Sequence, residues 1–391
     1  MNNTKFMLLT LAELHKPVIK NTVLFRSFMG QYNDNPKYIS EELHRRCPEI
    51  KTVWVVRDGK REDFPDYAKL VELGSAEYIR YISRAEVVVD NYSGCRSNFL
   101  DNGNIIKKLV LPVVGKRKKG QLNISTWHGT PLKHIALDEP KYKKSKHSRA
   151  YINADILMAG CKVTADAFST ALNWDKQIMM CGTPRNDLLF SDNAEKMKAK
   201  LGLPLDKKII MFAPTFRDSV EMSGISQLED IDFDRLFDAL NERFGGEWCF
   251  VFRSHNLVMK QIQENGLKVS DKIINGNEYS DMAEYLSCTD VLLTDYSSSM
   301  FDFALTGKPC FLYTPDLADY RSNERGFYFD IASTPFPIAG TFEELVDNIR
   351  NFNDSEYRDN VKLFLESIGN TENGTASEKT VDKILEHMKK R

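Results

Sequence analysis

A segment in the last third of the chain combines residue types that suit the binding of an anion. Residues 291–302 read VLLTDYSSSMFD, so that an apolar run breaks and Ser297, Ser298 and Ser299 open a helical stretch that runs to Leu305. The free backbone N–H groups and the dipole of a helix N-terminus attract negative charge, and serine hydroxyls add donors. The pattern suits a nucleotide diphosphate. The alternative is that Ser297 or Ser298 only caps a core helix.

His128 has the placement of a proton acceptor. It directly follows the predicted strand 123–127 and precedes Gly129 and Thr130, so it lies in a loop at a strand end. A histidine titrates near neutral pH and can take a proton from an attacking hydroxyl. Gly129 lets the backbone approach a substrate closely.

A second group of polar residues also follows predicted strands. His255 has a position equivalent to that of His128, with Arg253 two residues before it, and these two cationic groups can stabilise phosphate charge. Arg217 and Asp218 follow another strand, and Arg185 follows the turn Gly182-Thr183-Pro184. Some of these charges can instead brace the junction of two domains.

Composition and periodicity predict the elements that position these residues. The chain has 391 residues, 42% of them hydrophobic and 28% charged, which indicates a globular protein with two domains. Short apolar runs alternate with helical stretches, the pattern of parallel sheets covered by helices. Strands are predicted at 22–25, 52–56, 86–90, 123–127, 156–159, 209–213, 248–252, 273–275, 291–294 and 310–313, and helices at 36–45, 76–83, 163–171, 233–244, 281–286 and 299–305. A polar stretch at 191–208 reads as a linker helix and loop between the two halves.

Several protein classes are disfavoured. There is no Walker motif and no GxGxxG, which argues against a nucleoside triphosphatase and an ordinary dehydrogenase. The apolar stretch 6–12 is too short for a membrane span or a convincing signal peptide, so we expect residence in the cytoplasm. Seven cysteines without a CxxC pair predict reduced thiols, no disulfide and no structural zinc.

The net charge is only -2, but one segment is strongly basic. Between Lys107 and Arg149 there are about twelve lysines and arginines against two acids. Such a segment can hold a protein on an anionic membrane, at roughly 1 kcal/mol for each basic residue near the surface. It is also compatible with a solvated loop, and no nucleic-acid motif accompanies it. The residues expected to contact a membrane or a polyanion are Lys116, Arg117, Lys118, Lys119, Lys143, Lys144 and Lys146.

Six motifs together resemble the CDP-glycerol glycerophosphotransferase family, which includes teichoic acid primases and polymerases. They are FRSFMGQYNDNPKYI from residue 25, STWHGTPLK from 125, GTPRND from 182, APTFRD from 213, RSHN from 253 and LTDYSSSMFDFALTGKPCFLY from 293. The match continues through YRSNERGFYFD from 320 and covers nearly the whole chain in order.

The resemblance implies an α/β protein of GT-B fold, with two Rossmann-like domains that face each other across a cleft. Residues 1–190 would form the acceptor and membrane-facing domain, and residues 191–391 the domain that binds the CDP donor. The family transfers a polyol phosphate from a CDP-activated donor to a hydroxyl of a lipid-linked saccharide or a poly(polyol phosphate), and releases CMP. The resemblance thus implies a peripheral enzyme on the cytoplasmic face of the membrane that uses CDP-glycerol and an undecaprenyl-linked or polymeric acceptor in teichoic acid or capsule synthesis.

Roles for individual residues follow from the same resemblance. His128 would be the general base, and His255 would contact the donor pyrophosphate. Ser297 and Ser298 match the family's serine pair and are expected at the donor phosphates. The other expected contacts with the donor are Arg253, Arg217, Asp218 and Asp302, and those near the acceptor are Gly129, Thr130 and Arg185.

The chain departs from the family pattern at Asn256, where a proline is common, and it has no extra region before the first motif such as the long polymerases carry. No cofactor and no protein-bound metal are implied, although magnesium on the donor is compatible with the sequence. Three alternatives stay open: a CDP-ribitol enzyme, a GT-B glycosyltransferase that uses a nucleotide sugar, and a non-catalytic carbohydrate or polyanion binder. The sequence does not decide the acceptor, primase against polymerase activity, or the oligomeric state.

Overall fold

The computed structural model describes residues 8–9, 11–13, 15–57, 61–91, 118–140, 152, 154–215, 225–254, 273–317 and 326–390. The chain divides into two compact units, the first made of Met1–Gly129, His147–Asp187 and Thr371–Arg391 and the second of Thr130–Lys146 and Leu188–Asn370. The predicted boundary at residue 190 lies close to the passage from Asp187 to Leu188. The segment from Thr371 onward differs from the prediction, because it returns to the first unit.

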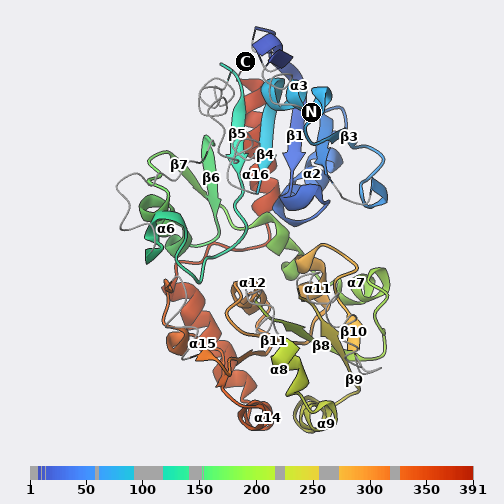
Figure 1. Ribbon diagram of the computed structural model, residues 1–391, viewed down its shortest axis with the longest axis vertical. Coiled ribbons are helices and arrows are strands. Elements are labelled where there is room, and N and C mark those ends of the chain that lie inside the picture. Colours follow the sequence, from blue (N-terminus) through green and yellow to red (C-terminus); the bar gives the residue numbers. More distant parts are fainter. Residues whose placement is uncertain are drawn as a thin grey trace. The chain divides into compact units, whose positions relative to one another are not determined.

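Within the described residues, the first unit contains a sheet of seven strands, all parallel (Figure 1). Their spatial order is β3 (Lys69–Glu72), β2 (Lys51–Val56), β1 (Ile19–Arg26), β4 (Ala85–Asp90), β5 (Leu122–Ser125), β6 (Ile156–Ala159) and β7 (Gln177–Met180). The chain leaves β1 toward one edge of the sheet and continues from β4 toward the other. Such a switch of direction opens a crevice at the carboxyl ends of the two strands, where doubly wound sheets bind ligands.

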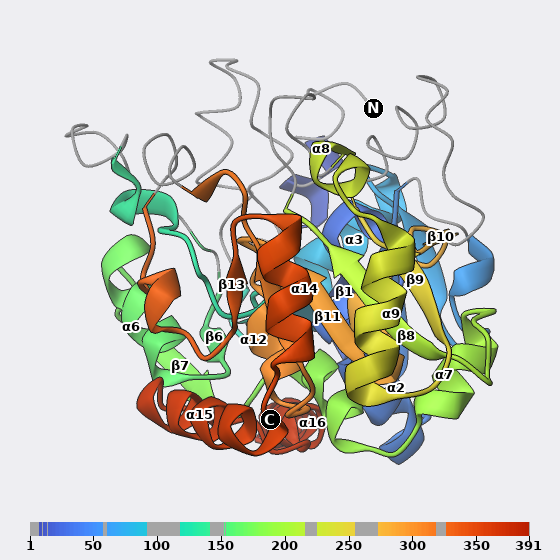
Figure 2. The same ribbon diagram turned by 90° about the horizontal axis from the view of Figure 1, so that it is seen from below.

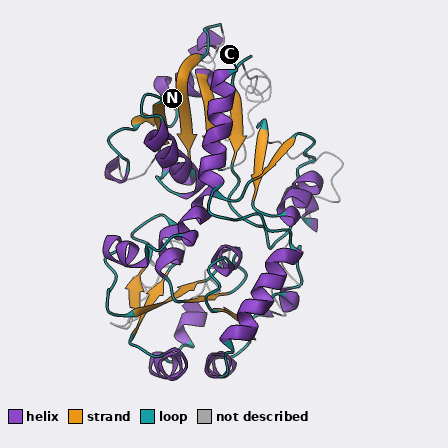
Figure 3. Ribbon diagram, turned by 180° about the vertical axis from the view of Figure 1, so that it is seen from behind, coloured by secondary structure: helices purple, strands orange, loops and turns teal. Residues whose placement is uncertain are grey.

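The central strands of the first sheet are buried on both faces, and residues of β1, β2 and β4 enter two different cores. In β1, Val23 and Phe25 pack with one cluster while Leu24 packs with the other. The first cluster includes Ile39 of α2 (Asp34–Arg46) and Ile384 of α16 (Ala376–Lys389), and the second is closed by α3 (Ala76–Arg84). Figure 3 shows helices over the strands of this sheet from the side opposite to Figure 1. The predicted run of apolar strands is therefore confirmed, with helices on each face.

In the described part of the second unit, six parallel strands repeat the same order. From edge to edge they are β10 (Ile273–Asn275), β9 (Trp248–Phe252), β8 (Lys208–Ala213), β11 (Val291–Thr294), β12 (Cys310–Tyr313) and β13 (Ile338–Ala339). The switch of direction lies between β8 and β11. The five strands predicted in this half are confirmed, whereas β13, like β3 and β7 in the first sheet, was not predicted.

Helices α9 (Phe233–Phe244) and α14 (Phe342–Arg350) lie side by side in the second unit (Figure 2). Ion pairs join them, from Arg235 to Glu343 at 3.2 Å and from Arg350 to Glu242 at 2.8 Å. The unit also holds α7 (Ala194–Lys200), which is the helix expected in the linker stretch, and α8 (Ile225–Glu229), α11 (Met282–Cys288), α12 (Ser299–Ala304) and α15 (Asp354–Ser367). In the first unit, α6 (Lys162–Ala171) connects β6 to β7.

Among the described residues, no helix is both long enough and apolar enough to cross a lipid bilayer. The cysteines of this part of the chain carry free thiols, and most of them are buried.

Candidate active site

His128 lies in the loop after β5, and its geometry suits a proton acceptor. Its Nδ1 lies 3.2 Å from the backbone oxygen of Asn91, the residue that follows β4. Because a carbonyl oxygen only accepts hydrogen bonds, Nδ1 carries the proton and Nε2 keeps its lone pair. The imidazole stacks on Trp127 with 4.3 Å between ring centroids and remains accessible to solvent. The ring is held in the tautomer that a general base requires.

Asp34, at the start of α2, connects Asn91 to Arg185. The Asn91 amide donates to Oδ2 of Asp34 at 2.5 Å, and Nη1 of Arg185 donates to Oδ1 at 2.8 Å. Asp34 has a left-handed backbone with φ of 56°. A non-glycine residue in that region costs about 1–3 kcal/mol, and such strain concentrates at functional sites. The carboxylate therefore fixes both neighbours of the His128 loop.

The surroundings of His128 favour its neutral form. Although part of the residue stays exposed, the protein atoms packed around the His128 ring desolvate it and lower its pKa below the ordinary value, and the nearby positive charge of Arg185 acts in the same direction. The charge of Asp34 and the hydrogen bond to Asn91 raise the pKa, but these two effects are smaller than those that lower it. At neutral pH the ring is therefore ready to accept a proton.

Asn35 and Gly129 hold the arginine against the loop. The buried Asn35 side chain donates to the backbone oxygen of Trp127 at 3.1 Å and accepts from the backbone N–H of Arg185 at 3.0 Å. Gly129 has φ of 118°, and a Cβ atom on it would lie 2.5 Å from Nη2 of Arg185. Only glycine lets the guanidinium lie this close to the residue after His128.

The structure thus brings three predicted site residues together in the first unit, namely His128, Gly129 and Arg185, while Thr130 belongs to the second unit. Sequence reasoning missed Asp34, Asn35 and Asn91. Asn91 could have been found, since it follows a predicted strand directly. The other two lie inside a motif noticed only for its resemblance.

Asp295 joins the two strand ends at the switch point of the second sheet. Its Oδ1 accepts from the backbone N–H of Thr215 at 2.8 Å, from the Thr215 hydroxyl at 2.7 Å and from the backbone N–H of Tyr296 at 2.6 Å. Thr215 follows β8 and Asp295 follows β11, and the aspartate is fully buried. The hydroxyl of Tyr296 donates to Asp316 at 3.0 Å. These bonds shape the loop that presents the serines, and the sequence analysis did not single out Asp295.

The serines themselves begin the short helix α12. The Ser297 and Ser299 hydroxyls lie 2.9 Å apart, and the backbone N–H of Ser299 donates to Oγ of Ser297 at 3.4 Å. Ser298 is the N-cap, yet among the described residues its side chain makes no capping hydrogen bond. Asp302 is 4% exposed, one turn into the helix. The capping alternative therefore does not account for Ser298, and its predicted contact with the donor phosphates stays a prediction.

Arg253, predicted at the donor, braces a loop of the second unit. Its guanidinium donates to the backbone oxygens of Tyr279 at 2.7 Å and Ser280 at 3.0 Å, and it lies over the ring of Tyr285. Its predicted contact with the donor is a further role that these bonds do not test.

The remaining predicted residues fall mostly outside the described part of the chain. These are His255, Arg217, Asp218, Lys116, Arg117, Lys143, Lys144 and Lys146. Lys118 and Lys119 are described, and Lys119 is exposed. The ammonium of Lys118 instead donates to the backbone oxygens of Glu13 and Lys16. The charge of Lys118 is therefore used in hydrogen bonds within the first unit. The exposed Lys119 is the better candidate for a membrane contact.

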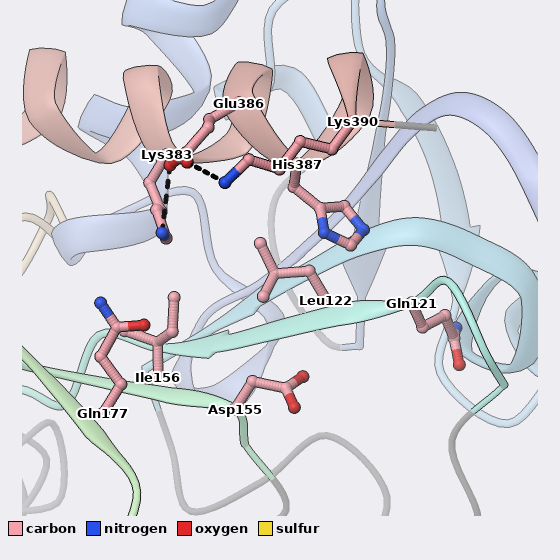
Figure 4. A pocket seen from close by; sticks show the side chains of 9 residues that line it. All are labelled: Gln121, Leu122, Asp155, Ile156, Gln177, Lys383, Glu386, His387 and Lys390. Atoms are coloured by element: carbon pink, nitrogen blue, oxygen red, sulfur yellow. Dashed lines mark hydrogen bonds and ion pairs between the residues drawn. The ribbon is translucent and has the colours of Figure 1, made fainter.

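A pocket of about 300 Å³ opens at the other end of the first sheet (Figure 4). It is bounded by the starts of β5, β6 and β7 and by the last turns of α16. Glu386 pairs there with Lys383 at 3.1 Å and with Lys390, so its charges largely compensate one another. Because His128 follows the carboxyl end of β5, this pocket is remote from the candidate site. Within the described residues, no group of three or more His, Cys, Asp or Glu side chains is placed to hold a metal ion.

Known proteins resemble the chain over nearly its whole length. The family described as CDP-Glycerol:Poly(glycerophosphate) glycerophosphotransferase matches residues 8–386. The teichoic acid poly(glycerol phosphate) polymerase of Bacillus subtilis (strain 168) is 31% identical over 94% of this chain and 49% of its own length. The polymerase of the same name from Staphylococcus epidermidis is 29% identical over 99% of this chain and 53% of its own length. The chain therefore spans about half the length of these two relatives.

A solved structure of the wall teichoic acid polymerase TagF, soaked with CDPG, superposes on 99% of this chain and 94% of its own with a TM-score of 0.78 and 28% identity. Together with the two parallel sheets, this similarity confirms the predicted GT-B-like two-domain α/β fold. The cleft between the domains stays a prediction. The family match over residues 8–386 and the 31% identity to the Bacillus subtilis polymerase show that the chain belongs to the CDP-glycerol:poly(glycerophosphate) glycerophosphotransferase family.

Proposed function

We propose that this chain transfers glycerol phosphate from CDP-glycerol to a hydroxyl of a polyol-phosphate or lipid-linked saccharide acceptor and releases CMP. The observation that carries the proposal is His128, whose Nδ1 is bound to the Asn91 carbonyl while Nε2 keeps a lone pair. Membership of the family supports the donor and the kind of polymer. The reaction belongs to the synthesis of teichoic acid or a related surface polymer.

In the proposed step, the acceptor hydroxyl oxygen attacks the phosphorus atom that bears glycerol. A new P–O bond forms, and the P–O bond to CMP breaks with its electron pair left on CMP. Nε2 of His128 takes the hydroxyl proton, which raises the nucleophilicity of the attacking oxygen. Arg185, held by Asp34 beside Gly129, adds positive charge near this loop. Positioning and electrostatic stabilisation supply most of the catalysis in phosphoryl transfer.

The donor diphosphate would bind at the carboxyl edge of the second sheet. Ser298 is half-buried there and free of a capping bond within the described residues, and the Asp295 bonds fix the loop before it. Hydroxyl and backbone donors at this position would stabilise the charge that develops on departing CMP. His255, Arg217 and Asp218 are proposed as further donor contacts, on the resemblance of their motifs alone.

Product analysis tests the proposal directly. Purified protein is incubated with CDP-glycerol or CDP-ribitol and a lipid-linked disaccharide analogue, and the products are analysed by mass spectrometry. We expect CMP and an acceptor heavier by glycerol phosphate, with both lost in His128→Ala. His387→Ala is the matched control, since this histidine binds the Gly120 carbonyl near the remote pocket. If neither CDP donor reacts and a nucleotide sugar supplied in a parallel assay releases a nucleoside diphosphate, the protein is a sugar transferase. Full activity of His128→Ala would remove the proposed base.

We further propose that the basic segment holds the protein on the inner face of the membrane, near an undecaprenyl-linked acceptor. The support is the charge of this segment, about twelve basic residues against two acids. Vesicles with and without anionic lipid, sedimented at low and high salt, test this proposal. A protein in which Lys116, Arg117, Lys119 and the lysines of 141–146 are neutralised should stay in the supernatant, and its full sedimentation with anionic vesicles would contradict the proposal.

A metal bound by the protein is not required in this mechanism, because helix dipoles and basic side chains can neutralise the departing nucleotide. Dialysis against EDTA followed by magnesium titration tests this proposal. Complete and reversible loss of activity would assign a metal to the donor or to the site.

A further inference from the structure

Glu372 lies far from His128 in the sequence but reaches the turn that carries Arg185. It follows Thr371, where the chain returns to the first unit between α15 and α16. Its Oε2 accepts from the backbone N–H of Thr183 at 2.8 Å, and its Oε1 accepts from the Asn186 side chain at 3.3 Å. These two partners stand on either side of Arg185 along the chain. The carboxylate therefore holds the turn on both flanks.

Two glycines make room for this carboxylate. A Cβ atom on Gly160 would lie 2.3 Å from Oε1 of Glu372, and one on Gly182 would lie 2.8 Å from Oε2. Both distances are shorter than any normal contact. The backbone N–H of Thr371 also donates to the Gly160 oxygen at 2.9 Å. A half-buried carboxylate is stable only when its oxygens accept hydrogen bonds. Here the donors are the Thr183 backbone N–H and the Asn186 side chain, and the two glycines leave room for the carboxylate to reach them.

Arg185 has little freedom once its turn is fixed. Its backbone N–H donates to Asn35 at 3.0 Å, and its guanidinium donates to Asp34 at 2.8 Å and packs on Gly129. Asp34 orients the charged end, whereas Glu372 fixes the backbone from which the side chain extends. A shift of the turn would move positive charge relative to the ring of His128, and displacements of about 1 Å at a reacting site can cost 100-fold in rate.

We infer that Glu372 is a positioning residue that acts through Arg185 in the transfer reaction. The inference rests on the proposed function, since it takes His128 as the base and Arg185 as its neighbour. The competing explanation is that Glu372 only attaches α16 to the first unit. Thr371 shares that attachment, because its hydroxyl donates to the Gly160 oxygen at 3.0 Å, but within the described residues its side chain makes no hydrogen bond to either flank of Arg185.

A double-mutant cycle separates the two explanations. We compare kcat/KM and its pH profile for the unchanged protein, Glu372→Gln, Arg185→Gln and the double variant, with Thr371→Val as the attachment control and thermal unfolding measured for each. Glu372→Gln should lower kcat/KM roughly tenfold and move the acidic limb of the profile to higher pH, because Arg185 lowers the pKa of His128. In the Arg185→Gln background, where no charge is left to position, the same change should have less than a roughly twofold effect. Thr371→Val should lower the Tm without moving the pH profile.

Equal losses from Glu372→Gln in both backgrounds, or a lower Tm with unchanged kcat/KM, would overturn the inference and leave the proposed function intact. If Arg185→Gln keeps full activity, Arg185 has no role in the reaction, and the inference falls with that role. His128→Ala reports on the proposed base separately.

Discussion

At the scale of single residues, the charges around His128 decide whether its ring can act as a base. Protein surroundings and Arg185 lower the pKa of His128, while Asp34 raises it. A histidine with a lowered pKa stays neutral to a lower pH than a free one. The Asn91 carbonyl fixes the tautomer, so the neutral ring presents its lone pair on one atom only.

The pH dependence of kcat/KM follows from this arrangement. We expect a plateau at neutral pH and a decline on the acidic side, with an apparent pKa below the usual histidine value of about 6.5. Arg185→Gln removes a charge that lowers the pKa of His128, so its acidic limb should move to higher pH. Initial rates between about pH 5 and 8 measure both profiles, and an unmoved limb in the variant would show that Arg185 does not act on His128.

Gly129→Ala should abolish most activity and destabilise the protein. The added Cβ atom meets Nη2 of Arg185 at 2.5 Å, and φ of 118° is strained for alanine by about 1–3 kcal/mol. Gly307→Ala is a matched control, because Gly307 also has a positive φ of 66° but nothing within 4 Å of its added Cβ. Both variants should lose stability in urea unfolding, and only Gly129→Ala should lose activity. Equal activity in the two would mean that the contact with Arg185 is dispensable.

Sequence patterns located the residues that follow long apolar strands, as His128 and the serines do. They did not locate Asp34 and Asn35, which belong to the start of a helix and act only because the sheet brings the ends of β1, β4 and β5 together. Side-chain pairs such as Asp34 with Arg185 join distant parts of the chain, and no local pattern specifies them.

At the scale of elements, aspartates at both ends of β11 tie the second sheet together. In the second sheet, Asp295 links the carboxyl ends of β8 and β11, while Asp290, at the opposite end of β11, accepts from the backbone N–H of Ile209 at 2.8 Å. Each aspartate links β8 to β11, but only Asp295 is fully buried and lies at the edge where parallel sheets bind ligands.

Because Asp295 and Asp290 lie at opposite ends of β11, one can serve as the control for the other. Asp295→Ala leaves two backbone N–H groups and one hydroxyl without their acceptor, which should lower the free energy of unfolding by roughly 3 kcal/mol and raise the KM for the CDP donor. Asp290→Ala should also destabilise the protein but leave the donor KM unchanged. Urea unfolding and steady-state kinetics check the pair, and a similar rise in KM for both would contradict the assignment of this edge to the donor.

Ten predicted strands are found in the structure, and nine of them are mostly buried apolar runs; the tenth, β10, is a three-residue edge strand. The missed strands β3, β7 and β13 lie at or near the sheet edges, are short, and keep partly exposed residues. An edge strand forms mainly because it pairs with its one neighbouring strand. Its own residues are only partly apolar, so its sequence predicts a strand weakly.

At the scale of the whole molecule, the first unit is completed by the helix α16. Val381 and Ile384 are fully buried in the same cluster as Val23 and Trp54. The helix is amphipathic, but nothing in its periodicity says which sheet its apolar face covers. The predicted domain of residues 191–391 wrongly included α16, which belongs to the first unit. A contact between segments so far apart in the sequence leaves no local pattern from which it could be predicted.

Ile384→Ala should therefore destabilise the first unit, although the residue lies close to the C-terminal end. Removal of a buried isoleucine side chain costs about 2–5 kcal/mol. Leu363→Ala, on α15, changes a side chain that is 63% exposed and should stay within about 0.5 kcal/mol of the unchanged protein. Denaturant unfolding compares the two, and equal stability would show that α16 is not part of the core of the first unit.

The return of α16 also bears on how the protein is made. A ribosome synthesises the strands of the first sheet well before it reaches the helix that covers one of their faces. At roughly 5–20 residues per second, the wait from Asp187 to the last turns of α16 is on the order of 10–40 s. During that time the apolar face built on Val23 and Trp54 lacks its partner, so the nascent chain should depend on chaperones more than its finished fold suggests.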